Sequence, residues 1–361
     1  MLGWRDVGNC GEYKYGKTLS STCIFNGSAD PWPIELWHFI LSFSVASGLG
    51  TALIFTPAVS SIAHFFLVKR AAATGLATTG GSVGGIIFPL MLQRLFHLIG
   101  YKWATRVLAL IFLFQLIIAN LLIRSRLPPP MKDSLASRIW PDWRIFKNVT
   151  FCLATAGTFF VEWALFVPLS YMTSYALSRD IDIALSYQLL AILNAGSFFG
   201  RWFPGYAADR FGRFNTMIIT VAICMLSVLC LWLTCSASEN VIPQIIVFAL
   251  IFGFASGSNI SLVPVCVGQL CSTEVFGRWY AGKRFGAVSS KYKRADVCSG
   301  LYTVVSFGCL TGIPVAGSLL ERSHGNYEGL IIFVGGCYAA GLACFIFARV
   351  GEVGWSLKKR Y

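Results

Sequence analysis

The apolar, glycine-rich stretch from Asn194 to Arg213 carries the residues best suited to chemistry in this chain. Arg201 lies about two helical turns before Asp209. A charged side chain at that depth in an apolar helix is costly, and it usually faces a water-filled path or a partner inside a helical bundle. We therefore expect Arg201 to be functional. The alternative is an arginine that snorkels to the surface or bonds to nearby carbonyl groups.

The turn that follows this helix is basic and contains closely spaced charges. Its pattern is Gly205-x-x-x-Asp209-Arg210-x-Gly-Arg213. The glycine lets two helices approach closely, and the charges can pin them together through ion pairs and contacts with helix ends. The pattern favours a gate latch at the cytoplasmic surface over a simple basic anchor.

Four further polar residues lie inside apolar segments. Glu162 can carry a proton if it is buried, although its position near a helix end also lets it reach the headgroups. Asn194 and Asn259 can contact a ligand or form interhelical hydrogen bonds, and Tyr171 can line a cavity or pack. No nucleophile–base pair, phosphate-binding loop or metal-ligand motif occurs, so we expect no enzymatic activity, no cofactor and no metal.

Composition indicates which elements position these residues. The chain has 361 residues, of which 56% are hydrophobic and only 12% are charged, and the mean hydropathy is +0.66. Recurrent runs of 18 or more nearly uncharged residues can each cross a bilayer as a helix. The sequence therefore predicts an all-α integral membrane protein. The net charge of +13 is spread over short loops, which argues against nucleic-acid binding. Twelve scattered cysteines predict buried thiols.

The apolar runs divide the chain into three spans, a linker and six further spans. We expect an irregular tail over 1–33, a partial bundle over 34–124, a hydrophilic linker over 125–148 and a six-helix bundle over 149–355. The predicted spans are 35–64, 71–97, 103–123, 149–177, 183–207, 214–236, 241–265, 299–320 and 328–350. Small residues and a proline in the second span, Gly80, Gly84, Gly85 and Pro89, predict close helix packing. Lysine and arginine gather in alternate loops, which predicts a cytoplasmic linker and C-terminus.

Several motifs together resemble the monocarboxylate-transporter branch of the major facilitator superfamily, especially its fungal permease-like members. They are Gly48-Leu-Gly-Thr-Ala-Leu-Ile-Phe-Thr-Pro57, the run from Gly80 to Pro89, the stretch from Gly200 to Arg213, and Ser306-Phe-Gly-x-Leu-Thr-Gly-Ile-Pro-Val-Ala-Gly317. The resemblance covers roughly residues 35–355. It implies a helical bundle of about nine transmembrane helices, equivalent to helices 4–12 of twelve.

The resemblance also implies secondary active transport of a small organic anion or related metabolite by alternating access around a midplane site. Similar transporters place an arginine at the position of Arg201, where it meets the substrate carboxylate. The mammalian members also place an aspartate for proton coupling one turn earlier, where this chain has Ser197. Proton coupling therefore stays open, as do the substrate and the oligomeric state. The resemblance favours the plasma membrane, with a vacuolar or other internal membrane as the alternative.

Two departures from the family pattern leave other interpretations open. Helices 1–3 have no counterpart and residues 1–33 resemble nothing in the family, and residues 281–300 form an insert that we interpret either as a retained intron or as a true cytoplasmic loop. We expect these 361 residues alone not to transport. The competing interpretation of the whole chain is a non-transporting or sensor-like membrane protein with the same fold.

Overall fold

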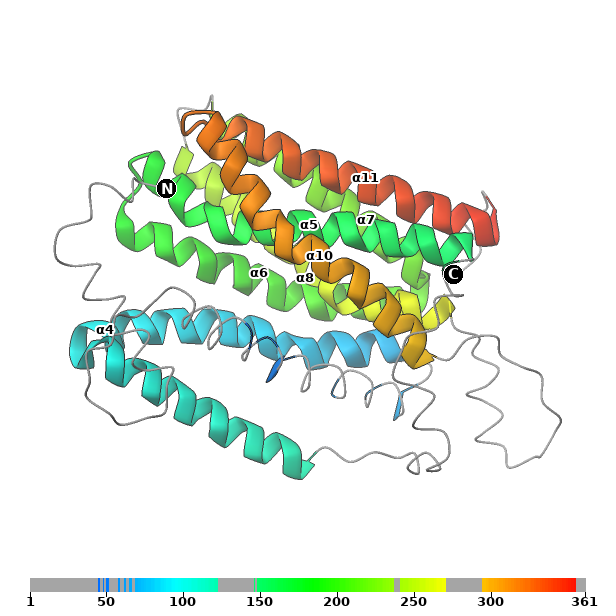
Figure 1. Ribbon diagram of the computed structural model, residues 1–361, viewed down its shortest axis with the longest axis horizontal. Helices are drawn as coiled ribbons and strands as arrows, with labels where there is room; N and C mark the ends of the chain where they lie inside the picture. The colour runs from blue at the N-terminus through cyan, green and yellow to red at the C-terminus, as the bar shows by residue number, and fades with distance from the viewer. Residues whose placement is uncertain are drawn as a thin grey trace. The chain divides into compact units, whose positions relative to one another are not determined.

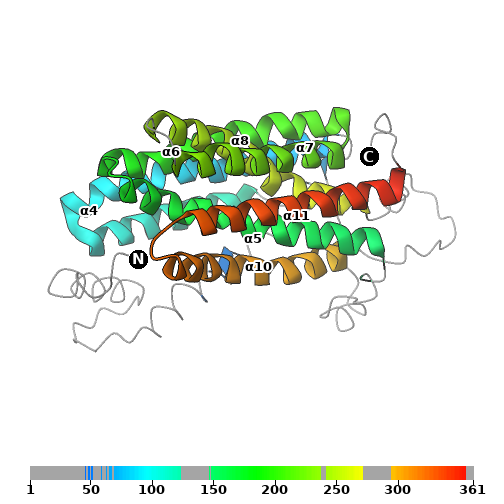
Figure 2. The same cartoon turned by 90° about the horizontal axis from the view of Figure 1, so that it is seen from above.

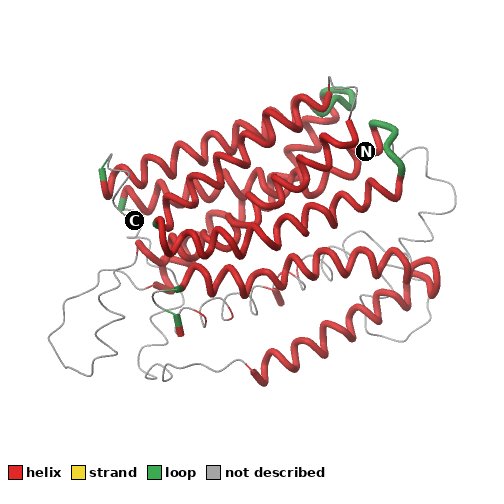
Figure 3. Tube along the Cα trace, turned by 180° about the vertical axis from the view of Figure 1, so that it is seen from behind, coloured by secondary structure: helices red, strands yellow, loops and turns green. Residues whose placement is uncertain are grey.

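The computed structural model describes residues 69–122, 146, 148–236, 241–270 and 294–354, together with the single residues 45, 48, 50, 51, 58, 62, 65 and 66. Every regular element in these ranges is helical (Figure 3), which confirms the predicted all-α class. The elements are α4 (Arg70–Leu122), α5 (Val149–Ser178), α6 (Ile183–Phe211), α7 (Arg213–Leu226), η4 (Ser227–Trp232), η5 (Leu233–Ser236), α8 (Val241–Leu270), α10 (Arg294–Arg322) and α11 (Glu328–Val353). Within the described ranges, seven helices are long and apolar enough to cross a membrane.

Helix α4 contains two predicted spans, 71–97 and 103–123. Its path breaks at Gly100, whose φ of 74° and ψ of 167° are not helical. A positive φ of this kind favours glycine, which has no Cβ to clash with the backbone. The rings of Phe88 and Phe112 lie 4.9 Å apart, so the two arms of α4 run back alongside each other. Eight of the nine predicted spans thus lie within the ranges that the structure describes.

The remaining predicted segments fall outside the described residues. They are the tail over 1–33, the first span over 35–64 apart from its single described residues, the linker over 125–148 apart from residues 146 and 148, and the part of the insert over 281–293. Helix α10 begins at Arg294, five residues earlier than predicted, so the last residues of the insert are helical.

Local signals explain where the C-terminal helices begin and end. The side chain of Asn148 accepts hydrogen bonds from the backbone N–H groups of Thr150 (3.0 Å) and Phe151 (3.4 Å), which caps α5. Asp182 caps α6 in the same way through the N–H of Ala184 at 3.2 Å. At Gly212 the φ of 101° ends α6 and starts α7, a turn that only glycine makes readily.

The structure divides into two compact units, residues 1–67 with 87–128 and residues 68–86 with 129–361. The second unit therefore joins the first part of α4 to the six C-terminal spans. Within it, α6 packs on α8, α5 packs on α10 and α11, and α7 packs on α8 and α11 (Figures 1 and 2). Its core includes the fully buried rings of Tyr175, Trp232 and Phe248, and Trp232 stacks on Phe248 at 5.2 Å.

Glycines bring the backbones of α6 and α8 into direct contact. A Cβ placed on Gly200 would overlap the carbonyl of Phe254, and one on Gly253 would overlap the carbonyl of Leu193. No side chain larger than hydrogen fits between the helices at these points. Four glycines make this contact, two on each helix: Gly196 and Gly200 on α6, and Gly253 and Gly257 on α8.

Candidate functional site

One face of α6 carries a row of polar and small residues that meets the first part of α4. We call this contact the α4–α6 seam. Its α6 members recur at helical spacings, so they lie on one face of the helix. The seam consists of Asn194, Ser197, Arg201, Gly205 and Asp209 on α6, and of Ala71, Ala72, Gly75, Thr78, Gly81, Ser82 and Gly85 on α4.

Arg201 lies in the middle of the seam and is half-buried. Its Nη1 donates a 2.5 Å hydrogen bond to the main-chain carbonyl of Thr78, and its Nε donates a 3.3 Å bond to Ser197 Oγ. A Cβ on Gly81 would lie 2.9 Å from Nη1, so the absence of a side chain there makes room for the guanidinium. A guanidinium has five N–H groups. Two of them are used here, and the other three donate to none of the residues that the structure describes.

Two further hydrogen bonds tie α6 to α4 beside Arg201. The hydroxyl of Ser82 donates to Ser197 Oγ at 3.2 Å, and both serines are buried. Asn194 Nδ2 donates to the carbonyl of Leu190 in its own helix at 2.8 Å and to the carbonyl of Gly85 on α4 at 3.4 Å. Asn194 therefore forms an interhelical hydrogen bond, which is one of the two roles that the sequence suggests for it.

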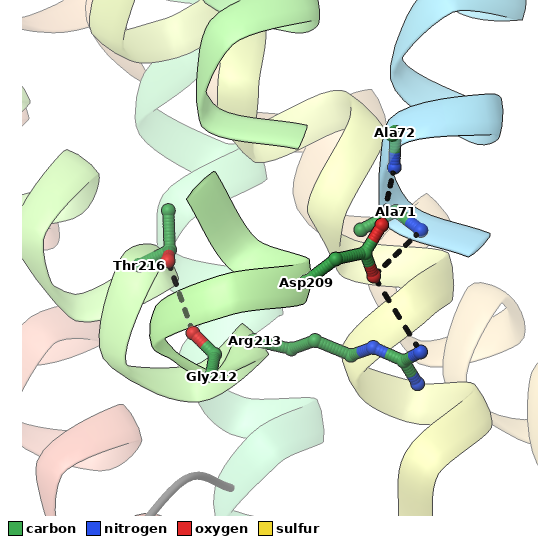
Figure 4. A network of polar contacts seen from close by, with 6 residues as sticks. All are labelled: Ala71, Ala72, Asp209, Gly212, Arg213 and Thr216. Atoms are coloured by element: carbon green, nitrogen blue, oxygen red, sulfur yellow. Dashed lines mark hydrogen bonds and ion pairs between the residues drawn. The ribbon is translucent and has the colours of Figure 1, made fainter. Parts of the chain in front are cut away.

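Asp209 closes one end of the seam (Figure 4). Its carboxylate accepts hydrogen bonds from the backbone N–H groups of Ala71 (3.2 Å) and Ala72 (3.0 Å). These N–H groups belong to the first turn of α4 and have no partner within that helix. The helix dipole also favours a negative charge at this position. Arg213 forms an ion pair with Asp209 at 3.7 Å.

Of the other two predicted latch residues, Gly205 lies in the seam and Arg210 lies outside it. A Cβ on Gly205 would lie 2.8 Å from the carbonyl oxygen of Ala71, so Gly205 permits the close approach that the sequence predicts. Arg210 instead lies over the ring of Tyr206, with its guanidinium carbon 4.5 Å from the ring centroid. It is an exposed cation–π contact rather than part of the seam.

The candidates on α5 face other helices. Glu162 is half-buried on α5. It forms no hydrogen bond or ion pair with any residue in the described ranges. Tyr171 Oη donates to the main-chain carbonyl of Ile313 on α10 at 3.3 Å, so this tyrosine connects two helices.

Asn259 lies in the core between α7 and α8. Its side chain is fully buried, accepts a 3.2 Å hydrogen bond from Thr220 Oγ1 and lies 3.6 Å from Cys224 Sγ through its Nδ2. This environment favours interhelical bonding over ligand contact for Asn259.

The seam also shows what inspection of the sequence missed. Of the predicted packing residues, Gly85 contacts α6, Gly84 is half-buried, and Pro89 is exposed within α4. A Cβ on Gly80 would meet no described atom within 4 Å. The α4 residues that bind Arg201 and Ser197 are Thr78 and Ser82, which sequence reasoning did not single out. Their spacing with Gly75 and Gly85, a repeat of three and four residues, is the signal that identifies this face.

These helices define the class of protein as a polytopic α-helical membrane protein. Residues 18–290 match the sequence pattern of the Major Facilitator Superfamily, and the chain belongs to this family. The match begins at residue 18, within the tail over 1–33 that we expected to lie outside the family pattern, and it ends within the predicted insert. The family predicted from the motifs is therefore confirmed.

Curated relatives are fungal transporters of this superfamily. The chain is 34% identical to the riboflavin transporter MCH5 of Saccharomyces cerevisiae over an alignment of 341 residues. This alignment covers 89% of the chain and 61% of the length of MCH5. It is 33% identical over 330 residues to the MFS transporter asaE of Aspergillus flavus, covering 91% and 69%. It is 33% identical over 318 residues to the fujikurins efflux protein of Gibberella fujikuroi, covering 87% and 62%. Because these relatives are named as transporters, the comparison agrees with the expectation that the chain is not an enzyme.

Proposed function

We propose that this chain forms part of a secondary active transporter that binds a small organic anion at Arg201. The observation that carries the proposal is the guanidinium itself. It is half-buried in an apolar helix, and three of its N–H groups donate to none of the described residues. A charged donor of this kind binds a carboxylate strongly in surroundings that contain little water.

The hydrogen bonds of Arg201 also favour one way of binding a carboxylate. Nε donates to Ser197, so the side of the guanidinium formed by Nε and Nη2 is partly occupied. Nη1 donates one hydrogen to Thr78, which leaves one N–H on Nη1 and two on Nη2. A carboxylate can therefore bind end-on across Nη1 and Nη2, with two parallel hydrogen bonds.

The seam supports alternating access as the transport mechanism. Asp209 and Gly205 hold one end of α6 against the first turn of α4. If that end faces the cytoplasm, as the distribution of basic loops predicts, these contacts stabilise the outward-facing state. Opening toward the cytoplasm then requires Asp209 to release the N–H groups of Ala71 and Ala72.

Proton coupling, if it occurs, is better supported at Glu162 than at Arg201. Ser197 cannot exchange a proton as a carboxylate does, and it stands one turn before the arginine. Glu162 is half-buried and forms no ion pair within the described part of the chain. A neutral, protonated carboxyl is favoured at such a place over an unpaired charge.

The relatives leave the substrate class broader than monocarboxylates. One of them is named for riboflavin and another for the fujikurins, so larger metabolites are candidates alongside lactate and pyruvate. We propose the plasma membrane as the location, with the vacuolar membrane as the alternative. A non-transporting, sensor-like protein is the competing function, and it would bind ligand without moving it.

Binding and uptake by the purified chain test the proposal. The chain would be reconstituted in vesicles, and labelled lactate, pyruvate and riboflavin would be offered to it, to Arg201→Ala and to Arg210→Ala. We expect anion binding to be lost in Arg201→Ala and kept in Arg210→Ala, because the contact that Arg210 makes among the described residues is with the exposed ring of Tyr206. Equal binding by all three proteins would overturn the role of Arg201. Uptake by the chain would argue against the sensor, and also against our expectation that these 361 residues alone do not transport.

A further inference from the structure

Ser82 differs from most hydroxyl residues around it in the direction of its hydrogen bond. Thr78 and Thr79 on the same helix donate to carbonyls of α4 itself, those of Gly75 and Leu76. This is the ordinary arrangement for serine and threonine inside a helix. Ser82 instead donates across the seam to Ser197 Oγ on α6.

Ser82 donates its hydrogen bond to Ser197, the same residue that accepts a hydrogen bond from Arg201. Ser197 Oγ accepts one hydrogen bond from Ser82 and a second from Nε of Arg201. A serine hydroxyl has two acceptor lone pairs, so these two bonds use both. Ser82 is fully buried and Ser197 nearly so. If the Ser82 hydroxyl were removed by substitution, water would therefore not readily take its place.

An arginine reaches its ligand through a long, flexible side chain, and its affinity depends on how well the guanidinium is oriented beforehand. Here Ser197 fixes Nε, Thr78 fixes Nη1, and Gly81 leaves the space that the guanidinium fills. Thr78, Gly81 and Ser82 all belong to α4, whereas Arg201 belongs to α6. The orientation of the guanidinium therefore depends on α4 lying against α6.

We propose that Ser82 is a positioning residue for Arg201, so that contact with α4 sets the anion affinity of a group on α6. The inference rests on the proposed anion-binding role of Arg201. Separation of α4 from α6 at this level removes the support of Ser82 and Thr78 at once, and the anion is then held less tightly.

Chemical labelling of arginine tests this in the full chain without a transport assay. Phenylglyoxal modifies accessible guanidinium groups, and the modification of Arg201 can be compared by peptide mass spectrometry with that of exposed Arg210 in the same molecule. The variants are Ser82→Ala, Ser82→Thr, which keeps the hydroxyl, and Ser258→Ala. Ser258 is the matched control because it is also fully buried, but its hydroxyl donates, within the described part of the chain, to the carbonyl of Ala255 in its own helix.

We expect Ser82→Ala to raise the labelling of Arg201 relative to Arg210 by about 3- to 10-fold, the range for loss of one hydrogen bond. Lactate should protect Arg201 from labelling in the unmodified chain, and Ser82→Ala should weaken this protection by a similar factor. Ser82→Thr and Ser258→Ala should behave like the unmodified chain. In an Arg201→Lys background, Ser82→Ala should no longer change the lactate-dependent shift in the unfolding midpoint.

The labelling experiment distinguishes failure of the proposed anion site from failure of the positioning role of Ser82. Absence of lactate protection in the unmodified chain would count against the anion site, that is, against the proposed function. Unchanged labelling of Arg201 in Ser82→Ala, or an equal rise in Ser258→Ala, would overturn the positioning role of Ser82. An effect of Ser82→Ala on lactate binding that persists with Arg201→Lys would overturn it as well.

Discussion

The guanidinium of Arg201 on α6 donates a 2.5 Å hydrogen bond to the main-chain carbonyl of Thr78 on α4. The acceptor is a backbone atom, so side-chain substitution at Thr78 does not remove it. A carbonyl oxygen is also a weaker partner for a guanidinium than a carboxylate is. Among the described residues no carboxylate pairs with this cation, so they hold it in place without neutralising it, as the proposed anion site requires.

Loss of the Asp209 carboxylate should loosen the end of the seam. We expect Asp209→Asn to lower the stability of the chain by about 1 kcal/mol, because the first turn of α4 loses a charged partner. Thermal unfolding in detergent measures this. Asp180→Asn is the matched control, since Asp180 is exposed in the turn between α5 and α6, and asparagine also tolerates its φ of 55°. Equal unfolding midpoints for the two variants would contradict the latch.

A larger side chain in place of Gly200 should push α6 and α8 apart. The Cβ of alanine would overlap the carbonyl of Phe254, and backbone cannot move aside as a flexible side chain does. We expect Gly200→Ala to destabilise the chain by roughly 1–3 kcal/mol, as overpacking generally does. Gly336→Ala in α11 is the control, because its Cβ meets no described atom within 4 Å. Calorimetry of both variants should separate them clearly; tolerance of Gly200→Ala would show that the helices are not in backbone contact.

Removal of the Asn259 amide should affect stability and leave ligand binding unchanged. We expect Asn259→Leu to lower the free energy of unfolding by about 0.5–1.5 kcal/mol, because Thr220 and Cys224 lose a buried partner, while the Thr220 hydroxyl keeps its bond to the carbonyl of Met217. Asn120→Leu is the comparison, since Asn120 is exposed and its amide, among the residues that the structure describes, donates to the carbonyl of Leu116 in its own helix. A large rise in the Kd for lactate without a change in unfolding would instead place Asn259 at the ligand.

Substitution of Glu162 tests proton coupling. If uptake is stimulated by external acid, Glu162→Gln should abolish the stimulation and leave a basal rate, because glutamine resembles the protonated carboxyl but cannot release a proton. Uptake by vesicles at two external pH values measures this. Glu321→Gln, a substitution at an exposed carboxyl at the end of α10, is the control. Retained acid stimulation in Glu162→Gln would assign coupling to another group.

Much of the fold follows from hydrophobicity and capping alone. Helix α5 was expected over 149–177 and is observed over Val149–Ser178, because Asn148 supplies a cap where the apolar run begins. Gly212 likewise marks the boundary between α6 and α7. The start of α10 at Arg294 was missed because residues 294–298 are too polar to be recognised as part of a span.

The site could be predicted only from its α6 side. Arg201 and Asp209 stand out because charge is rare in apolar helices. Their partners do not, since Thr78 contributes a carbonyl that every residue has and Ala71 and Ala72 contribute only N–H groups. Backbone partners depend on which helix lies opposite, and hydropathy carries no information on that point.

The backbone contact between α6 and α8 has a consequence for how this protein can diversify. With glycine required on both helices, neither can rotate or slide along the other without steric overlap. The two helices must therefore move as one rigid strut whenever α6 shifts against α4. The glycines on the contact face cannot be replaced by any residue with a Cβ, because there is no space for one. Adaptation to a new cargo must arise on the other faces of the strut, where a side chain can change without forcing the pair apart.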